Sequence, residues 1–369
     1  MKFNQIFCSN PSIENNSIKF ELENVVREVI NSGNYILGEQ VENFEKDFAT
    51  YIKTQYCIGV NSGTDALAIA LKALEIGIGD EVIIPSHTAV ATASAVYSTG
   101  ATLVFADVSE SSMTIDPDSV SKLINAKTKA VIAVHLYGFP CDIDKLNEIC
   151  KQNGIYLLED CAQAHGAEYK GNKVGTFGIF GCFSFYPTKN LGAIGDGGAI
   201  VTSDVELYRK CIALRQYGWD SDRTSILKST VSRLDEIQAA ILRVKLKYLD
   251  SNNQRRIEIA HQYKSSLNIE TLIMPPESIQ AKHVFHLYVI RVNERSKYIR
   301  KLNENGIFPG IHYPKPVHMH PAFQIYYTNN KMSLKHTETL SKEILSLPMY
   351  PGLTEIEVNR VIEGMKSVR

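Results

Sequence analysis

One lysine of this sequence stands in a setting that could do covalent chemistry. Lys189 lies within the stretch CFSFYPTKNLGAIGDGGAIVT (residues 182–202), between an aromatic run that ends in Pro187 and a glycine-rich turn. Aromatic neighbours and a proline would desolvate the ammonium group, lower its pKa and make the neutral amine available. A neutral amine on a rigid turn can form a Schiff base with an aldehyde. The alternative is a surface lysine on a hairpin turn, where a lone lysine is usually found.

A carboxylate at the end of an apolar run supplies a second chemical group. Asp160 follows IYLLE (residues 155–159), and a carboxylate at the buried end of a strand needs a cation or several donors. The pyridinium nitrogen of pyridoxal 5'-phosphate is such a cation, and an aspartate keeps it protonated so that the ring acts as an electron sink. Gln163 could reach the phenolic oxygen of the same ring. A helix N-cap or a buried salt bridge at Asp160 is the alternative.

A third group suits a phosphate. Ser62, Gly63 and Thr64 lie between a predicted strand and a predicted helix, where free backbone N–H groups and a glycine make an anion site. Ser184 precedes the lysine by five residues, and in a strand its hydroxyl would face away from its aromatic neighbours, towards such an anion. The alternatives are simple N-capping by Ser62 or Thr64, and a backbone cap at Ser184.

These groups reinforce one another because each stands at a predicted strand end. Gly63, Asp160 and Lys189 follow in that order along the chain, and the stretch from the aspartate to the lysine allows one crossing of a sheet and back. A phosphate cradle, a carboxylate for a ring nitrogen and a desolvated amine together predict a Schiff-base lysine that holds pyridoxal 5'-phosphate.

The elements around these residues predict an α/β fold. Unbroken apolar runs alternate with helical patterns, which is typical of a mainly parallel sheet covered on both faces. About seven strands are expected between residues 56 and 202, and ligands of such sheets bind beyond the carboxyl ends of the strands. The expected strands lie at residues 56–60, 82–85, 102–106, 130–136 and 155–159, with one more before the lysine turn and one after it.

The character of the sequence changes towards the C-terminus. Residues 233–263 form a long helical pattern, followed by a strand at 286–292 and helical patterns at 298–305 and 354–367. We therefore expect two domains. Residues 1–245 would form the large α/β domain with an N-terminal helix, and residues 246–369 a small α+β domain.

Composition excludes several classes of protein. The 369 residues include 39 basic and 40 acidic side chains and no basic run, which argues against nucleic acid as the main partner. No apolar stretch reaches membrane-spanning length, and the first dozen residues lack the apolar core of a signal peptide. The seven cysteines are scattered without a C-x-x-C pair, so neither a zinc site nor a disulfide framework is expected. A reducing cytoplasm is the expected location.

Five segments of the sequence resemble one known family. The sequence is similar to the DegT/DnrJ/EryC1/StrS sugar aminotransferases, and the similarity extends from residue 35 to residue 354. Dehydratases that share this fold replace the lysine with histidine, whereas this chain keeps Lys189. The segments are SGTDAL (62–67), GDEVIIPSHTAVAT (79–92), EDCAQAHGA (159–167), FSFYPTKNLGAIGDGGAIVT (183–202) and SRLDEIQAAIL (232–242).

The resemblance implies a fold-type-I enzyme that depends on pyridoxal 5'-phosphate and works as a homodimer with active sites at the subunit interface. It implies that Lys189 forms the Schiff base and then carries a proton between the substrate carbon and the cofactor. Asp160 would pair with the pyridine nitrogen and Gln163 with the ring hydroxyl. The phosphate would be held by the N–H groups of Gly63 and Thr64 and by the Ser184 hydroxyl.

The resemblance also implies a reaction and a substrate class. An amino group would move from L-glutamate to a keto group of a nucleotide-linked deoxysugar. His87 and LRQYGW (residues 214–219) resemble members that act at C-3 of a dTDP-3-keto-6-deoxyhexose, for O-antigen or another glycan. Amination at C-4 of a UDP-, GDP- or dTDP-4-keto-6-deoxysugar is the alternative. The polar candidates for the sugar or nucleotide, each with ordinary packing as its alternative, are His87, Tyr186, Tyr217, His312 and Tyr313.

Two positions depart from the family pattern. Many members carry an aromatic residue that stacks on the cofactor ring where this chain has Ala89. Many also carry an asparagine that reaches the partner subunit's phosphate where this chain has Val231. These losses would be the signs of a non-catalytic regulator or scaffold that kept the fold, which is the rival from another class. A NAD-dependent Rossmann enzyme is disfavoured because no G-x-G-x-x-G follows the first strand.

Overall fold

A seven-stranded sheet forms the centre of the molecule. The structure is a computed structural model and describes residues 5–328 and 332–368. The strand order is β2-β10-β9-β6-β5-β3-β4, and all neighbours are parallel except β10, which runs antiparallel to both β2 and β9. This confirms the expected mainly parallel sheet. The strands are β2 (Tyr56–Val60), β3 (Glu81–Pro85), β4 (Thr102–Ala106), β5 (Thr128–Val134), β6 (Tyr156–Asp160), β9 (Phe180–Ser184) and β10 (Gly198–Thr202).

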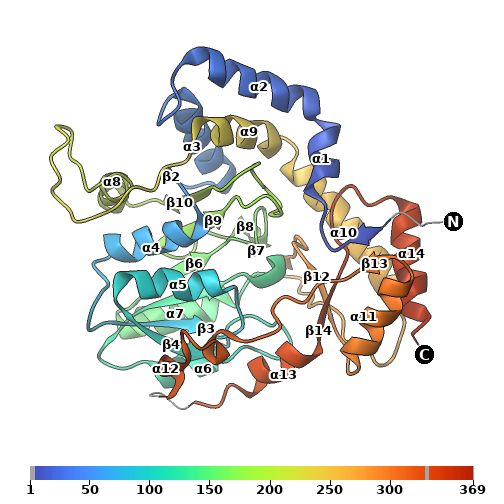
Figure 1. Cartoon of the computed structure of the whole chain (residues 1–369). Helices are drawn as coiled ribbons and strands as arrows, with labels where there is room; N and C mark the ends of the chain where they lie inside the picture. The colour runs from blue at the N-terminus through green and yellow to red at the C-terminus, as the bar shows by residue number, and fades with distance from the viewer. Residues whose placement is uncertain (1–4, 329–331, 369) are drawn as a thin grey trace.

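Helices cover both faces of the sheet, which explains why its strands are almost continuously apolar (Figure 1). Successive side chains of a strand point to opposite faces, so Ile58 and Ile200 pack into one core and Cys57 and Val201 into another. The first face carries α4 (Gly63–Ala73), α5 (Val90–Thr99) and α8 (Val205–Leu214), and the second carries α3 (Glu39–Ile52), α6 (Pro117–Leu123) and α7 (Ile143–Asn153).

The long helical pattern at residues 233–263 is two helices rather than one. The backbone leaves regular helical geometry at Tyr248, which has φ −101° and ψ −6°. The first helix packs against α2 and α3 beside the sheet, and the second runs to the C-terminal part of the chain (Figure 1). These helices are α9 (Glu236–Leu246) and α10 (Leu249–Ser266), and α2 is Lys19–Ser32.

The C-terminal part has its own apolar core. Strands β12 (Tyr288–Arg291) and β14 (Ile344–Leu347) pair antiparallel and pack with α10, α11 (Arg295–Glu304) and α14 (Glu355–Lys366). Residues near the N-terminus join this core, because β1 (Ile6–Phe7) pairs in parallel with β13 (Ile307–Phe308). The division into residues 1–245 and 246–369 stays a prediction.

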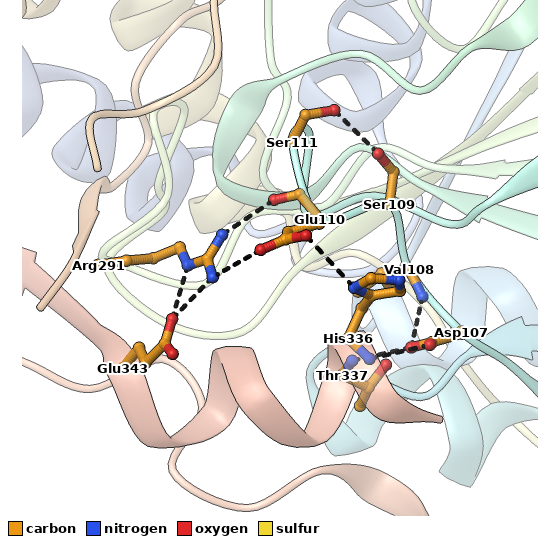
Figure 2. A network of polar contacts seen from close by, with 9 residues as sticks. All are labelled: Asp107, Val108, Ser109, Glu110, Ser111, Arg291, His336, Thr337 and Glu343. Atoms are coloured by element: carbon orange, nitrogen blue, oxygen red, sulfur yellow. Dashed lines mark hydrogen bonds and ion pairs between the residues drawn. The ribbon is translucent and has the colours of Figure 1, made fainter. Parts of the chain in front are cut away.

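A polar network joins the C-terminal part to the sheet (Figure 2). Asp107, just after β4, accepts hydrogen bonds from the N–H groups of His336 and Thr337 at 3.0 and 2.8 Å. A carboxylate at the N-terminus of α13 (Lys335–Glu343) accepts hydrogen bonds from its first N–H groups. Its negative charge also interacts favourably with the positive end of the helix dipole. Arg291 of β12 extends the network through ion pairs with Glu110 at 3.1 Å and with Glu343 at 2.8 Å.

Across residues 5–328 and 332–368, every helix is either too short or too polar to cross a membrane.

Candidate active site

One cavity of about 240 Å³ brings together all six residues predicted to bind the cofactor. It lies at the carboxyl ends of β2, β6 and β9, where ligands of α/β sheets are expected. Its walls come from the start of α4, the end of β6 and the turn between β9 and β10. The six are Gly63, Thr64, Asp160, Gln163, Ser184 and Lys189.

The first turn of α4 forms one end of the cavity. Ser62 is the N-cap of the helix, since its hydroxyl accepts from the Asp65 N–H at 3.1 Å. The N–H groups of Gly63 and Thr64 stand in the first turn, where a helix offers no carbonyl partner. The Ser184 side chain packs against this turn, because a Cβ added to Gly63 would lie 2.6 Å from Ser184 Cβ. The arrangement fits a phosphate group.

Adding a methyl group at Gly63 should disturb this end of the cavity. We expect Gly63→Ala to weaken pyridoxal 5'-phosphate binding by about tenfold or more, since Ser184 must move away from the phosphate. The measurement is a fluorescence titration of the cofactor-free protein. Gly77→Ala is the matched control, because its new Cβ would meet Thr99 O at an ordinary 3.4 Å. Equal affinity of both variants would contradict the assignment.

Asp160 forms the opposite end of the cavity as a buried carboxylate. Its Oδ2 accepts from the Thr92 hydroxyl at 2.9 Å and its Oδ1 from the Ala162 N–H at 3.1 Å. Burial raises the pKa of Asp160, and these donors together with the Lys189 charge oppose the increase. A carboxylate that is only partly compensated fits a cationic ring nitrogen in the same cavity.

Lys189 lies in the turn between β9 and β10 and lines the cavity between these two ends. The turn is closed by its N–H, which donates to the Tyr186 carbonyl at 2.8 Å. Burial lowers the pKa of Lys189 to about 8, and the Asp160 charge opposes the decrease. The neutral amine is therefore accessible near physiological pH, as Schiff-base chemistry requires.

The low pKa of Lys189 predicts a pH dependence. Only the neutral amine attacks an aldehyde, so the rate of covalent capture of pyridoxal 5'-phosphate by the cofactor-free protein should rise with pH and level off above about 8. A lysine with an ordinary pKa near 10.4 would still accelerate about tenfold per pH unit there. Stopped-flow absorbance between pH 6 and 10 checks this. A rise that continues to pH 10 would contradict a desolvated Lys189.

The amide of Gln163 is oriented by a closed ring of hydrogen bonds. Tyr137 N–H donates to Gln163 Oε1 at 2.7 Å, and Gln163 Nε2 donates to the Tyr313 hydroxyl at 2.9 Å. The Tyr137 hydroxyl closes the ring by donating to the His312 carbonyl. Because Tyr137 N–H can only donate, the NH₂ group of Gln163 must face Tyr313, which leaves one N–H for a cofactor oxygen.

Removing the Tyr137 hydroxyl should destabilise the protein. Tyr137→Phe leaves the partly buried His312 carbonyl without its donor, so the free energy of unfolding should fall by about 1–3 kcal/mol. Urea denaturation of the cofactor-free protein measures the change. The control is Tyr97→Phe, at a tyrosine that is 62% exposed, for which the midpoint should not move. A Tyr137→Phe variant as stable as this control would argue against the ring.

Three of the five predicted substrate residues lie beside the lysine. A second cavity of about 270 Å³ is lined by Tyr186, His312 and Tyr313, and Lys189 lines both cavities. Tyr186 also lines both, so the cofactor cavity and this second cavity adjoin at Tyr186 and Lys189. This second cavity provides space for a substrate next to the cofactor.

The structure does not bring the other two predicted substrate residues to either cavity. His87 is buried, and its Nε2 lies 2.7 Å from the Tyr137 hydroxyl. It therefore packs behind Tyr137 and not against a ligand. Burial lowers the pKa of His87 to about 4. Tyr217 packs on Trp219 in the segment between α8 and α9, which extends away from the sheet (Figure 1).

The two departures from the family pattern also have places in the structure. Ala89 lines the cofactor cavity, so a methyl group stands where many members of the family carry an aromatic ring. Val231 is 41% exposed, outside both cavities. Sequence reasoning did not single out Thr92, the hydroxyl donor to Asp160, although a helical pattern over residues 88–98 could have indicated it.

The donor set fits each part of pyridoxal 5'-phosphate. The N-terminus of α4 with Ser184 suits the phosphate, the Asp160 carboxylate suits the ring nitrogen, and the Lys189 amine suits the aldehyde. Gln163 retains an N–H for the ring hydroxyl. No other cofactor is needed to explain these four groups.

Known proteins resemble the chain over nearly its whole length. The sequence pattern of the DegT/DnrJ/EryC1/StrS aminotransferase family matches residues 16–366. The dTDP-3-amino-3,4,6-trideoxy-alpha-D-glucose transaminase of Streptomyces venezuelae is 43% identical over 350 residues, which cover 95% of this chain and 92% of that protein. The dTDP-3-amino-3,6-dideoxy-alpha-D-galactopyranose transaminase of Aneurinibacillus thermoaerophilus is 44% identical over 345 residues, which cover 94% of each.

The fold agrees with the sequence similarity. The crystal structure of DesV from S. venezuelae matches with a TM-score of 0.95 at 41% identity, covering 99% of this chain and 98% of that chain. Aminotransferases of this family depend on pyridoxal 5'-phosphate. The chain therefore belongs to the DegT/DnrJ/EryC1/StrS aminotransferase family and is a pyridoxal-phosphate-dependent aminotransferase.

Proposed function

We propose that the protein moves the amino group of L-glutamate to C-3 of a dTDP-linked 3-keto-6-deoxyhexose. The observation that carries the proposal is the position of Lys189 between a cavity with the donors for a cofactor and a second cavity lined by polar aromatic side chains. The two relatives described above, both named as transaminases of dTDP-linked 3-amino sugars, support the choice of substrate.

Each residue of the cofactor cavity would have a separate role that follows from its position. Pyridoxal 5'-phosphate, when bound, supplies an electron sink for the pair of electrons left when a proton is removed. Lys189 Nζ would take and return that proton, because it stands at the junction of the two cavities with a pKa of about 8. Asp160, held by Thr92, would keep the ring nitrogen protonated. Gly63, Thr64 and Ser184 would hold the phosphate.

The wider biological setting is part of the same proposal. We propose a homodimer with active sites at the subunit interface, in which the outward-reaching segment with Tyr217 and Val231 meets the other subunit. All seven cysteines are free thiols, which supports a reducing cytoplasm. An O-antigen or another surface glycan would receive the amino sugar.

A panel of nucleotide sugars tests the proposal. The purified holoenzyme is incubated with L-glutamate and either 3-keto or 4-keto 6-deoxyhexoses linked to dTDP, UDP or GDP, and products are identified by mass and NMR. We expect amination of the dTDP-linked 3-keto sugar. Amination of a 4-keto sugar alone would establish the C-4 alternative instead. Failure of L-glutamate to convert the bound cofactor to its amino form would overturn the enzymatic proposal altogether.

A further inference from the structure

The side chain of Asn190, next to Lys189, has a fixed orientation. Its Nδ2 donates to the Val284 carbonyl at 3.1 Å and to Asn253 Oδ1 at 2.8 Å. A backbone carbonyl can only accept, so this end of the Asn190 amide is the NH₂ group. The Asn253 amide is fixed in the same way, because its Nδ2 donates to the His165 carbonyl at 2.8 Å.

This orientation determines where the ring proton of His286 lies. The Nδ1 of His286 is 3.1 Å from Asn190 Oδ1, and since that oxygen can only accept, Nδ1 carries the proton. Burial and the nearby charges of Lys189 and Arg256 hold the pKa of His286 well below its ordinary value. The ring is therefore neutral, and its Nε2 is a hydrogen-bond acceptor that contacts no donor in the described part of the chain.

The acceptor belongs to the cavity that would receive the substrate. His286 lines the second cavity together with Lys189, Tyr186 and Tyr313. Two neighbouring groups of this cavity are held by partners within the protein. His312 Nδ1 is 2.9 Å from the Ser346 hydroxyl, and the Tyr313 hydroxyl accepts from Gln163. His286 Nε2 thus offers a ligand a fixed, neutral acceptor within the cavity that Lys189 shares.

We propose that His286 is a substrate-binding residue whose Nε2 accepts a hydrogen bond from a sugar hydroxyl on a carbon next to the one that is aminated. The proposal rests on the proposed function, since it takes the second cavity as the place of the keto sugar. The α-amino group of glutamate is the reacting group and is consumed, so it cannot serve as a lasting donor to His286. A sugar without the hydroxyl would leave a buried acceptor unpaired, which is an effective basis for discrimination.

Two substitutions and three sugars test this assignment on the holoenzyme. His286→Leu removes both ring nitrogens, whereas His286→Gln restores an acceptor oxygen near the position of Nε2. Both variants lose the imidazole Nδ1–H that donates to Asn190 Oδ1, and of the two only glutamine supplies an acceptor oxygen. The substrates are a dTDP-3-keto-6-deoxyhexose and its 2-deoxy and 4-deoxy forms, each measured with saturating L-glutamate.

We expect the native enzyme to show a KM about tenfold higher for one of the two deoxy sugars than for the parent sugar. His286→Leu should raise the KM of the parent sugar by a similar factor and no longer distinguish it from that deoxy sugar. His286→Gln should recover part of the discrimination. In both variants, the half-reaction of the bound cofactor with L-glutamate alone, followed by absorbance, should stay within about twofold of the native rate.

Two outcomes would overturn the assignment. One is a His286→Leu variant that distinguishes the sugars as the native enzyme does. The other is a glutamate half-reaction that falls together with the sugar reaction in both variants, which would indicate a structural role. A native enzyme that reacts with L-glutamate but aminates no keto sugar is a different result, because it refutes the proposed function and the role of His286 with it.

Discussion

Lys189→Ala should lower the rate of amino transfer from L-glutamate to a keto sugar by at least about 10³-fold. Within the described part of the chain, the two cavities share this lysine and contain no other. The variant therefore loses the nucleophile for the cofactor aldehyde and the group that moves the proton. Steady-state kinetics measure the loss of rate. Borohydride reduction followed by mass spectrometry measures the loss of the nucleophile, since only the native chain should gain the mass of the cofactor.

Two further variants make this result specific to the chemistry of Lys189. Lys189→Arg keeps a positive charge near Asp160 but is not a nucleophile, so it should be as inactive as the alanine variant. Lys145→Ala removes a lysine whose side chain is 67% exposed and should leave the rate unchanged. Retention of a tenth or more of the native activity by Lys189→Ala would refute the role assigned to it.

Asp160→Asn should lower kcat by about 10²–10³-fold while the cofactor still binds. Asparagine has nearly the same shape as aspartate but no charge, so it cannot keep the ring nitrogen protonated. Thr92→Val is the matched comparison, because it removes the 2.9 Å hydrogen bond to Asp160 and leaves the carboxylate. That variant should lose only about tenfold or less. A fully active Asp160→Asn variant would refute the pairing.

Asp160→Asn should lower the activity but should not lower the stability of the cofactor-free protein. Burial raises the pKa of Asp160, so the fold disfavours the charged form of this carboxylate. A neutral asparagine relieves that penalty, and the urea midpoint of the cofactor-free Asp160→Asn variant should equal or exceed the native one. A midpoint well below the native one would show that the carboxylate stabilises the cofactor-free fold.

The sequence allowed the sheet and the cofactor residues to be predicted because both depend on local patterns. Apolar runs of strand length marked the seven strands, and chemistry-bearing residues lie at or shortly after the ends of three of them, at Gly63, Asp160 and Lys189. In a parallel sheet the carboxyl ends of strands share one edge, so residues far apart in sequence could be placed together without knowing the fold in detail. The cavity that contains all six predicted cofactor residues follows from this rule.

Contacts between distant segments could not be predicted in this way. The ring of hydrogen bonds around Gln163 depends on Tyr137, a non-glycine residue with φ +61°, and on Tyr313, which lies 150 residues away. No local pattern indicates a left-handed tyrosine, which is uncommon. The acceptor of His286 depends on Asn190, which lies 96 residues earlier in the chain. His87 resembled a substrate residue by its motif, but packing places it behind Tyr137.

The pairing of the chain's two ends constrains how the protein can be made. Strand β1 has its partner in β13, so residues Ile6–Phe7 leave the ribosome some 300 residues before the strand they join. Asp107 likewise leaves the ribosome long before His336 and Thr337, whose N–H groups donate to its carboxylate. Domains commonly fold from the N-terminus during synthesis. Here the nascent chain must keep β1 unpaired until residues 307–308 have emerged, and only then can β1 complete the C-terminal core.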